Sequence, residues 1–284
     1  MTRFWRIVHP RSNDYRDVFV NGEIRTAHLL PDVGCRTCAS RRSSDRVLPF
    51  DCPADWQSRL TPRRGYEYRV TNAEFDAMRE ELARAVANFP TSLGPLKPGD
   101  GFQPVLLKVP SRPKADFLWP PIAVLVSERV RALCVDEGWT GVVFSRVEYE
   151  CVGRRSPNAK LRSRGGEPED MLRRIPAGRA MSEVCGYAHV TVTQKSGLPP
   201  GVDPASVCPE CGGATLFKHP KRQLVFEESM WPGDDFCRLA TTRYVIITDR
   251  VKRALERLEA TNVEFQDAAE EVGVFVPKPG AISR

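Results

Sequence analysis

Two pairs of cysteines with the same internal spacing are the residues best suited to chemistry in this chain of 284 residues. They lie at residues 35–38 (CRTC) and 208–211 (CPEC). This spacing lets both thiolates of one tight turn reach the same metal ion, and two such turns complete a tetrahedral four-cysteine site. The sequence therefore predicts one structural Zn(II), held by turns at residues 33–40 and 206–214 through four ligands: Cys35, Cys38, Cys208 and Cys211.

Other interpretations of these cysteines stay open. In a simple zinc ribbon the two pairs lie about 15–20 residues apart, whereas 169 residues (positions 39 to 207) separate Cys38 from Cys208. A zinc site would then join two distant segments of the chain. Otherwise the pairs are isolated free thiols or redox dithiols, although a redox pair normally opens a helix and neither pair is followed by a helical pattern. Cys52 is the one nearby cysteine that would be able to replace a ligand.

Catalysis is not expected at such a site, because zinc with four cysteine ligands has no open coordination position. The chain also lacks a phosphate-binding loop, a dinucleotide-binding glycine motif, a nucleophile elbow and a His-Glu-x-x-His motif. Its four histidines are isolated from one another in the sequence, and a lone histidine in a strand is more often structural than catalytic. We therefore expect a protein that is not an enzyme.

The remaining cysteines and the apolar segments indicate the compartment. A total of nine cysteines with no export signal argues against a disulfide framework. Cys134 and Cys237 fall in apolar patterns, which predicts buried thiols that behave as small hydrophobic side chains. The longest apolar run is far shorter than the roughly 18 residues that a membrane span needs. These features predict a soluble, cytoplasmic protein.

The elements that must position the cysteines are predicted to be short, because the chain contains 24 prolines and 20 glycines. The clearest helix begins with a capping box at residues 71–74 (TNAE) and continues to about residue 88. Short strands are predicted at residues 4–8, 17–20 and 104–109. We expect an α+β fold with mixed or antiparallel sheets, few helices and a zinc-ribbon-like four-cysteine clamp.

Two segments, at residues 121–150 and 242–271, resemble each other at a constant offset of 121 positions. Ser127 aligns with Thr248, and each is followed by an acidic residue and a helical pattern. Each segment predicts a strand, an N-cap, a helix of about three turns and a second strand. We interpret them as a duplicated strand–helix–strand unit inside a single zinc-clamped domain that spans residues 1–284.

Charge is distributed unevenly along the chain, whose formal net charge is +6. Residues 152–180 are rich in arginine and either contact phosphate or form a mobile, solvated loop; the lack of aromatic residues for base stacking favours the loop. Near the C-terminus, acidic residues gather without a basic neighbour: Glu259, Glu264, Asp267, Glu270 and Glu271. This acidic segment is the candidate surface for a basic protein partner, because complementary charge speeds association.

The order of these motifs resembles the double-CXXCG motif proteins of myxobacteria, which include immunity proteins of swarming-inhibition toxin systems. The resemblance extends over nearly the whole chain, in patches, at residues 21–28, 30–38, 121–144, 208–212, 235–239 and 245–265. Ala39 and Ser40 depart from the pattern, because the first pair lacks the glycine that follows the second one. The resemblance implies an intracellular protein that protects its producer by binding a delivered toxin, and it implies no catalytic residues.

Three classes of function are therefore weighed. We favour an immunity protein that binds and neutralises a cognate protein toxin stoichiometrically, without a membrane or a nucleic acid as partner. The alternative is a zinc-ribbon nucleic-acid-binding protein, which the two cysteine pairs and the net charge of +6 would permit. No specific feature of the sequence favours an enzyme.

Overall fold

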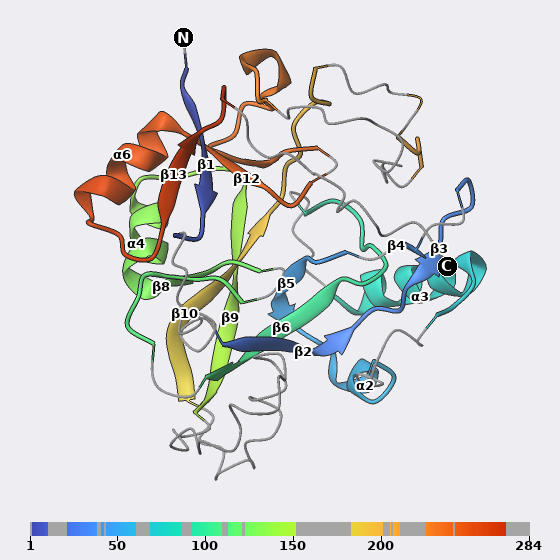
Figure 1. Ribbon diagram of the computed structural model, residues 1–284. Helices are drawn as coiled ribbons and strands as arrows, with labels where there is room; N and C mark the ends of the chain where they lie inside the picture. Colours follow the sequence, from blue (N-terminus) through green and yellow to red (C-terminus); the bar gives the residue numbers. More distant parts are fainter. Residues whose placement is uncertain are drawn as a thin grey trace, which may run out of the picture.

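The computed structural model describes residues 2–10, 22–38, 41–42, 44–60, 69–86, 93–109, 113–120, 123–151, 183–200, 205, 207–210, 225–240 and 242–270. The arginine-rich segment 152–180, the predicted strand 17–20 and Cys211 lie outside these residues. The described part of the chain contains four α-helices and three β-sheets, one with both parallel and antiparallel pairs (Figure 1). The predicted α+β class with few helices and mixed sheets is confirmed. No helix in these residues is long and apolar enough to cross a membrane.

The larger sheet has the strand order β2-β6-β9-β10-β8-β7, and β5 pairs with β6 outside this path. Its strands are β2 (Glu23–Leu29), β5 (Val47–Asp51), β6 (Gly101–Val109), β7 (Phe117–Leu118), β8 (Leu125–Ser127), β9 (Val142–Cys151) and β10 (Glu183–Val192). The central strand β6 buries Val105, Leu107 and Val109 completely. These side chains alternate along the strand, so they form one apolar face of the sheet.

Helix α3 (Asn72–Ala85) covers one end of this sheet together with the short helix α2 (Ala54–Gln57). The predicted capping box is confirmed, since the Thr71 hydroxyl accepts from the Glu74 amide (3.2 Å) and the Glu74 carboxylate accepts from the Thr71 amide (2.7 Å). Phe75 and Leu82 are buried against Trp56 of α2 in one hydrophobic cluster. The helix ends at Ala85, slightly before the predicted end.

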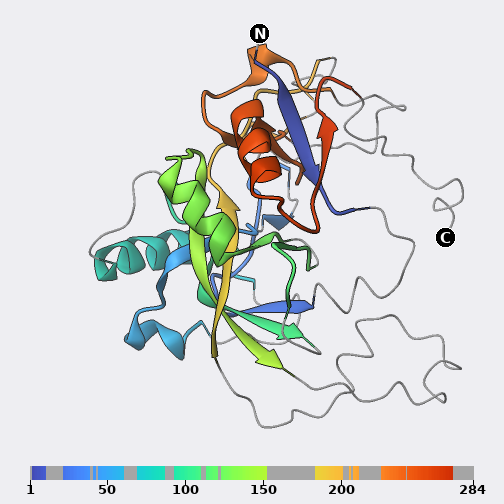
Figure 2. The ribbon, with the colours of Figure 1, turned by 90° about the vertical axis from the view of Figure 1, so that its left-hand side faces the viewer.

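The smaller sheet has the order β11-β12-β1-β13, and all its pairs are antiparallel. Its strands are β1 (Phe4–Val8), β11 (Phe236–Arg238), β12 (Val245–Thr248) and β13 (Glu264–Asp267). Helix α4 (Glu128–Asp136) and helix α6 (Asp249–Arg257) lie side by side where the two sheets meet (Figures 1 and 2). Val130 and Cys134 of α4 and Val251 and Leu255 of α6 are buried in one shared core cluster.

The segments that align in the sequence have the same order of elements. One is β8–α4–β9 and the other is β12–α6–β13, and their helices begin after Ser127 and Thr248, as predicted. Neither hydroxyl, however, binds a helix amide. The expectation of ordinary side-chain caps is therefore wrong, because each hydroxyl donates to an aspartate of the preceding strand region instead: Asp116 or Asp235.

A further strand completes each of the two arrangements with the same register. In the first unit (β7, β8, α4, β9 and β10), Ala188 of β10 pairs with Val126 and Arg146. In the second unit (β11, β12, α6, β13 and β1), Trp5 of β1 pairs with Ile247 and Asp267. Both partners are thus displaced by 121 positions, so β1 occupies in the second unit the place that β10 occupies in the first.

The two units are joined by reciprocal hydrogen bonds from their aspartates. Asp116 of the first unit accepts from the amide (2.9 Å) and the hydroxyl (3.0 Å) of Thr261 in the second. Asp235 of the second unit accepts from the amide (3.0 Å) and the hydroxyl (3.3 Å) of Thr140 in the first. Each aspartate therefore ties its own helix start to the other unit, 145 or 95 positions away.

Candidate metal centre

The first cysteine pair lies in the connection of a short antiparallel ribbon. Strand β3 (Val33–Gly34) pairs with β4 (Arg41–Arg42), and Cys35 and Cys38 lie between the two strands. The Cys35 side chain is 3% exposed, whereas Cys38 is exposed. The ribbon thus presents two thiols from one tight turn, which is the local geometry that the spacing predicts.

The start of α3 holds this turn in place. The Asn72 side chain donates a hydrogen bond to the Gly34 carbonyl (3.0 Å), and the Arg36 guanidinium pairs with Asp76 (2.5 Å). Both partners lie in the first turns of α3, whose own start is fixed by the capping box described above. The position of the first cysteine turn is therefore set by a capped helix as well as by the ribbon.

Three of the four predicted ligands come together across 173 positions of sequence. The sulfur atoms of Cys35, Cys38 and Cys208 all lie within 4.8 Å of one another, and the Cys35–Cys208 pair is 3.6 Å apart. Sulfurs at the corners of a tetrahedron around a metal with bonds of about 2.3 Å lie about 3.8 Å apart. The cluster therefore fits a metal ion bound by thiolates. Cys211, the fourth predicted ligand, lies outside the described residues.

A carboxylate that the sequence analysis did not single out joins the two cysteine turns. Glu210 accepts hydrogen bonds from the amide (3.1 Å) and the hydroxyl (2.9 Å) of Thr37, and the Cys35 thiol lies 3.5 Å from the same oxygen. Glu210 and Thr37 occupy the interior positions of the two motifs. Their pairing holds the turns together through groups that are not themselves sulfur ligands.

Burial and local amides act in opposite directions on the Cys35 thiol. Burial raises its pKa, while the backbone amides of Thr37 and Cys38 lower it, and the net effect is a raised pKa. Amides that point at a sulfur stabilise its thiolate form, which is the form that binds a metal. The turn thus offers hydrogen bonds to a thiolate ligand, even though burial by itself favours the protonated thiol.

The other described cysteines belong to the core. Cys52, Cys134 and Cys237 are at most 4% exposed, and burial raises their pKa to about 11, 12 and 12. The prediction of core thiols at Cys134 and Cys237 is confirmed. Among the described residues Cys52 is not part of the sulfur cluster, so it does not replace a ligand there.

Comparisons with models of known protein families and with curated proteins found no match.

The acidic segment lies around β13 and the end of α6. Glu259 follows the helix with a positive φ of 53°, Glu264 begins β13, and Asp267 ends it. Asp267 forms an ion pair with Arg3 (2.7 Å), so its charge is partly compensated within the chain. Glu271 lies outside the described residues. Glu264 and Asp267 thus lie on β13, an edge strand of the smaller sheet, while Glu259 precedes this strand in the chain and Glu270 follows it.

Proposed function

We propose that Cys35, Cys38, Cys208 and Cys211 bind one Zn(II) as a structural clamp. Three of these sulfurs are within 4.8 Å of one another, and all four have the two-residue spacing typical of zinc-binding turns. Zinc is the usual metal of such all-cysteine sites. Bound there, the zinc ion would stabilise the contact between the first cysteine ribbon and the segment around Cys208. These two segments are far apart in the sequence, so the metal would link them directly.

We propose that the protein is an immunity protein that neutralises a cognate toxin by stoichiometric binding in the cytoplasm of its producer. The observation that supports this most is the meeting of the two distant cysteine turns, with Glu210 joined to Thr37. It brings together residues from both motifs of the double-CXXCG pattern that the sequence resembles. A metal with four cysteine ligands would support a binding surface and would offer no open position for catalysis.

Co-expression in sensitive cells tests this function directly. We expect the protein to restore growth when it is produced together with the toxin encoded beside its gene, and we expect a one-to-one complex to co-purify. The measurement is the number of surviving colonies with and without the protein. Failure of zinc-loaded, folded protein to protect against any neighbouring toxin would contradict the proposal. Salt-dependent retention on DNA or RNA would instead favour a zinc-ribbon nucleic-acid-binding protein.

The acidic segment remains our proposed contact surface for a basic region of the toxin. Replacing Glu264 and Glu270 by lysine is expected to slow association about tenfold or more at low salt, because steering depends on the sign of the local charge. Glu80 and Asp136, exposed acids elsewhere, provide a matched control when they are replaced by lysine in the same way. Association rates measured by surface plasmon resonance at two salt concentrations check this; equal slowing in both variants would exclude a local surface.

We also propose that the first and second units are copies of one ancestral unit. Their strand registers correspond at a constant offset of 121 positions, and their aspartates form reciprocal contacts. Left-handed backbone conformations also recur at corresponding positions: Gly138 and Glu259 have φ of 62° and 53°, and Gly141 and Asn262 have φ of 79° and 61°. Because a positive φ is uncommon in residues other than glycine, its recurrence at both pairs of corresponding positions supports a common origin.

A further inference from the structure

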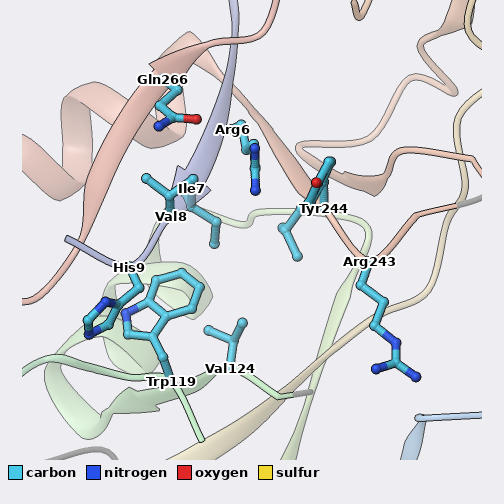
Figure 3. Close-up of a pocket in the computed structure, with 10 residues that line it drawn as sticks. Arg6, Ile7, Val8, His9, Trp119, Val124, Arg243, Tyr244 and Gln266 are labelled. Carbon is cyan, nitrogen blue, oxygen red and sulfur yellow. The ribbon is translucent and has the colours of Figure 1, made fainter. Parts of the chain in front are cut away.

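A pocket of about 320 Å³ opens beside β1 in the second unit (Figure 3). Its polar and aromatic lining residues are Arg6, His9, Trp119, Arg243, Tyr244 and Gln266. Among the lining residues that the structure describes, two are arginines and none is acidic, so these side chains carry positive charge into the pocket. The Arg6 guanidinium lies 3.5 Å above the Tyr244 ring, and the His9 ring meets Trp119 edge-on at 6.3 Å between centroids. Two flat aromatic walls and two guanidinium groups therefore surround one opening.

The register of the two units identifies the positions of the first unit that correspond to this pocket. Arg6 corresponds to His189, since they pair with Ile246 and Leu125, which are 121 positions apart. Gln266 corresponds in the same way to Ser145, because Arg6 pairs with Gln266 and His189 with Ser145. Arg6 and Gln266 of the pocket thus occupy the same places in the strand arrangement as His189 and Ser145 in the first unit.

In the first unit, the corresponding positions bind an extended segment of this chain, the start of β5. The Val47 amide donates to the Thr191 hydroxyl (3.2 Å). The Val47 carbonyl accepts from the hydroxyls of Ser145 (2.9 Å) and Thr191 (3.0 Å). Thr191 lies two residues after His189 on β10, where Val8 lies two residues after Arg6 on β1. In the first unit, backbone groups of Val47 thus bind Ser145 and Thr191. The corresponding residues of the second unit, Gln266 and Val8, line the open pocket.

A carboxylate, Asp45, lies two residues before Val47 in that segment. Asp45 forms an ion pair with Arg238 (2.7 Å), and its side chain is 16% exposed. Burial alone would raise the pKa of Asp45, but the nearby Arg238 and Arg243 outweigh this effect. The net pKa of Asp45 is lowered, so the ionised form is favoured. Arg243 lies 3.6 Å from Asp45 and also lines the open pocket, and its own side chain is 62% exposed. Asp45 therefore lies next to one of the two arginines of the open pocket.

We propose that the open pocket binds an extended peptide segment with an aspartate or glutamate, contributed by the protein partner. Its carboxylate would be received by Arg6 and Arg243, and its backbone by the Gln266 side chain at the place of Ser145. The volume lies at the lower end of the range for ligand pockets, roughly 300–1,000 Å³, which suits a few residues of peptide. This inference deepens the proposed function and rests on it in taking the partner to be a protein toxin.

A short synthetic peptide tests the pocket without the toxin. The probe is a labelled, amidated peptide with the sequence of residues 44–49 (SDRVLP). It copies the segment that binds Ser145 and Thr191 in the first unit. In fluorescence anisotropy we expect this peptide to bind about tenfold more tightly than its Asp-to-Asn version, because charge-assisted hydrogen bonds are roughly twice as strong as neutral ones. Equal binding of the two peptides, or no binding of either, would overturn the proposal.

Matched arginine variants locate the binding. Arg243→Gln is expected to weaken the binding of the aspartate-containing peptide about tenfold. Arg253→Gln, which removes an arginine that is 71% exposed on α6, should change binding less than about twofold. Equal effects of the two variants would place the peptide elsewhere and overturn the proposal. The peptide assay contains no toxin. Failure of peptide binding would therefore overturn the pocket proposal alone, and the co-expression assay would still test the proposed function.

Discussion

Replacing Cys208 with serine is expected to reduce the zinc content from one ion per chain to less than about one in ten chains. A serine hydroxyl does not supply the thiolate that zinc requires in such a site. The free energy of unfolding should fall by about 4 kcal/mol when free zinc is 1,000 times its dissociation constant, since binding to the folded state alone contributes that amount. Metal analysis by mass spectrometry and urea denaturation in the presence of zinc measure the two effects.

Cys134→Ser is the matched control for this prediction. Cys134 is 3% exposed, as Cys35 is, but it lies in the core cluster beneath α4 and outside the sulfur cluster. This variant should keep one zinc per chain even if burying a hydroxyl lowers its stability. A chelator should destabilise the wild type and Cys134→Ser but leave Cys208→Ser unchanged. A full complement of zinc in Cys208→Ser would show that the metal is bound elsewhere.

Local patterns predicted helices α3, α4 and α6 and several strands well, whereas the short helix α2 was not predicted. The capping box at residues 71–74 and the stripe that includes Phe75 and Leu82 indicate α3, because the helix start and its buried face are both encoded locally. The starts of α4 and α6 follow for the same reason from an apolar strand and a hydroxyl residue followed by an acid. These features depend on neighbours in sequence, so a single chain displays them.

Non-local pairings were not predictable in this way. Nothing in the sequence of β1 indicates that it occupies the place of β10, because that equivalence exists only through pairing with strands more than 200 positions away. The roles of Ser127 and Thr248 were misjudged for the same reason. Their acceptors, Asp116 and Asp235, lie 11 and 13 positions earlier, directly before strands β7 and β11.

The candidate site was predicted from spacing only as far as its sulfurs. The cysteine spacing identified Cys35, Cys38 and Cys208, but Glu210 is recognised only when the two turns meet. A carboxylate inside one motif and a hydroxyl inside the other are a weak signal, because either side chain is ordinary in an exposed turn. The pocket beside β1 carries no sequence signal at all, since its lining residues come from five separate segments.

Replacing Asp235 with alanine is expected to lower the free energy of unfolding by about 3 kcal/mol. Its carboxylate accepts from the amide and the hydroxyl of Thr140, from the hydroxyl of Thr248 and from Arg250, and Asp235 is only 6% exposed. The variant would leave a part-buried amide without an acceptor at the junction of the two units. The Arg250 ion pair adds little to this figure, because that side chain is 53% exposed.

Asp136→Ala is the control, since Asp136 is an exposed aspartate at the end of α4 and its loss should cost less than about 0.5 kcal/mol. Asp116→Ala should resemble Asp235→Ala, because Asp116 makes the reciprocal contact with Thr261. Urea denaturation of the three variants at pH 7 provides the comparison. Equal stability of Asp235→Ala and Asp136→Ala would show that the reciprocal contacts do not hold the units together.

The contribution of Asp235 should also depend on pH in one direction. Burial raises its pKa, but hydrogen bonds from Arg250, the Thr140 amide and the Thr248 hydroxyl lower it further, so the folded state favours the carboxylate. A folded pKa below the unfolded value of about 3.9 gives stability that is fully present above that value and is lost as the pH falls through the folded pKa. The difference in unfolding free energy between the wild type and Asp235→Asn should therefore be constant between about pH 5 and about pH 7, and it should shrink below about pH 4. A difference that stays the same down to about pH 3 would mean that the shape of the side chain, and not its charge, stabilises the junction.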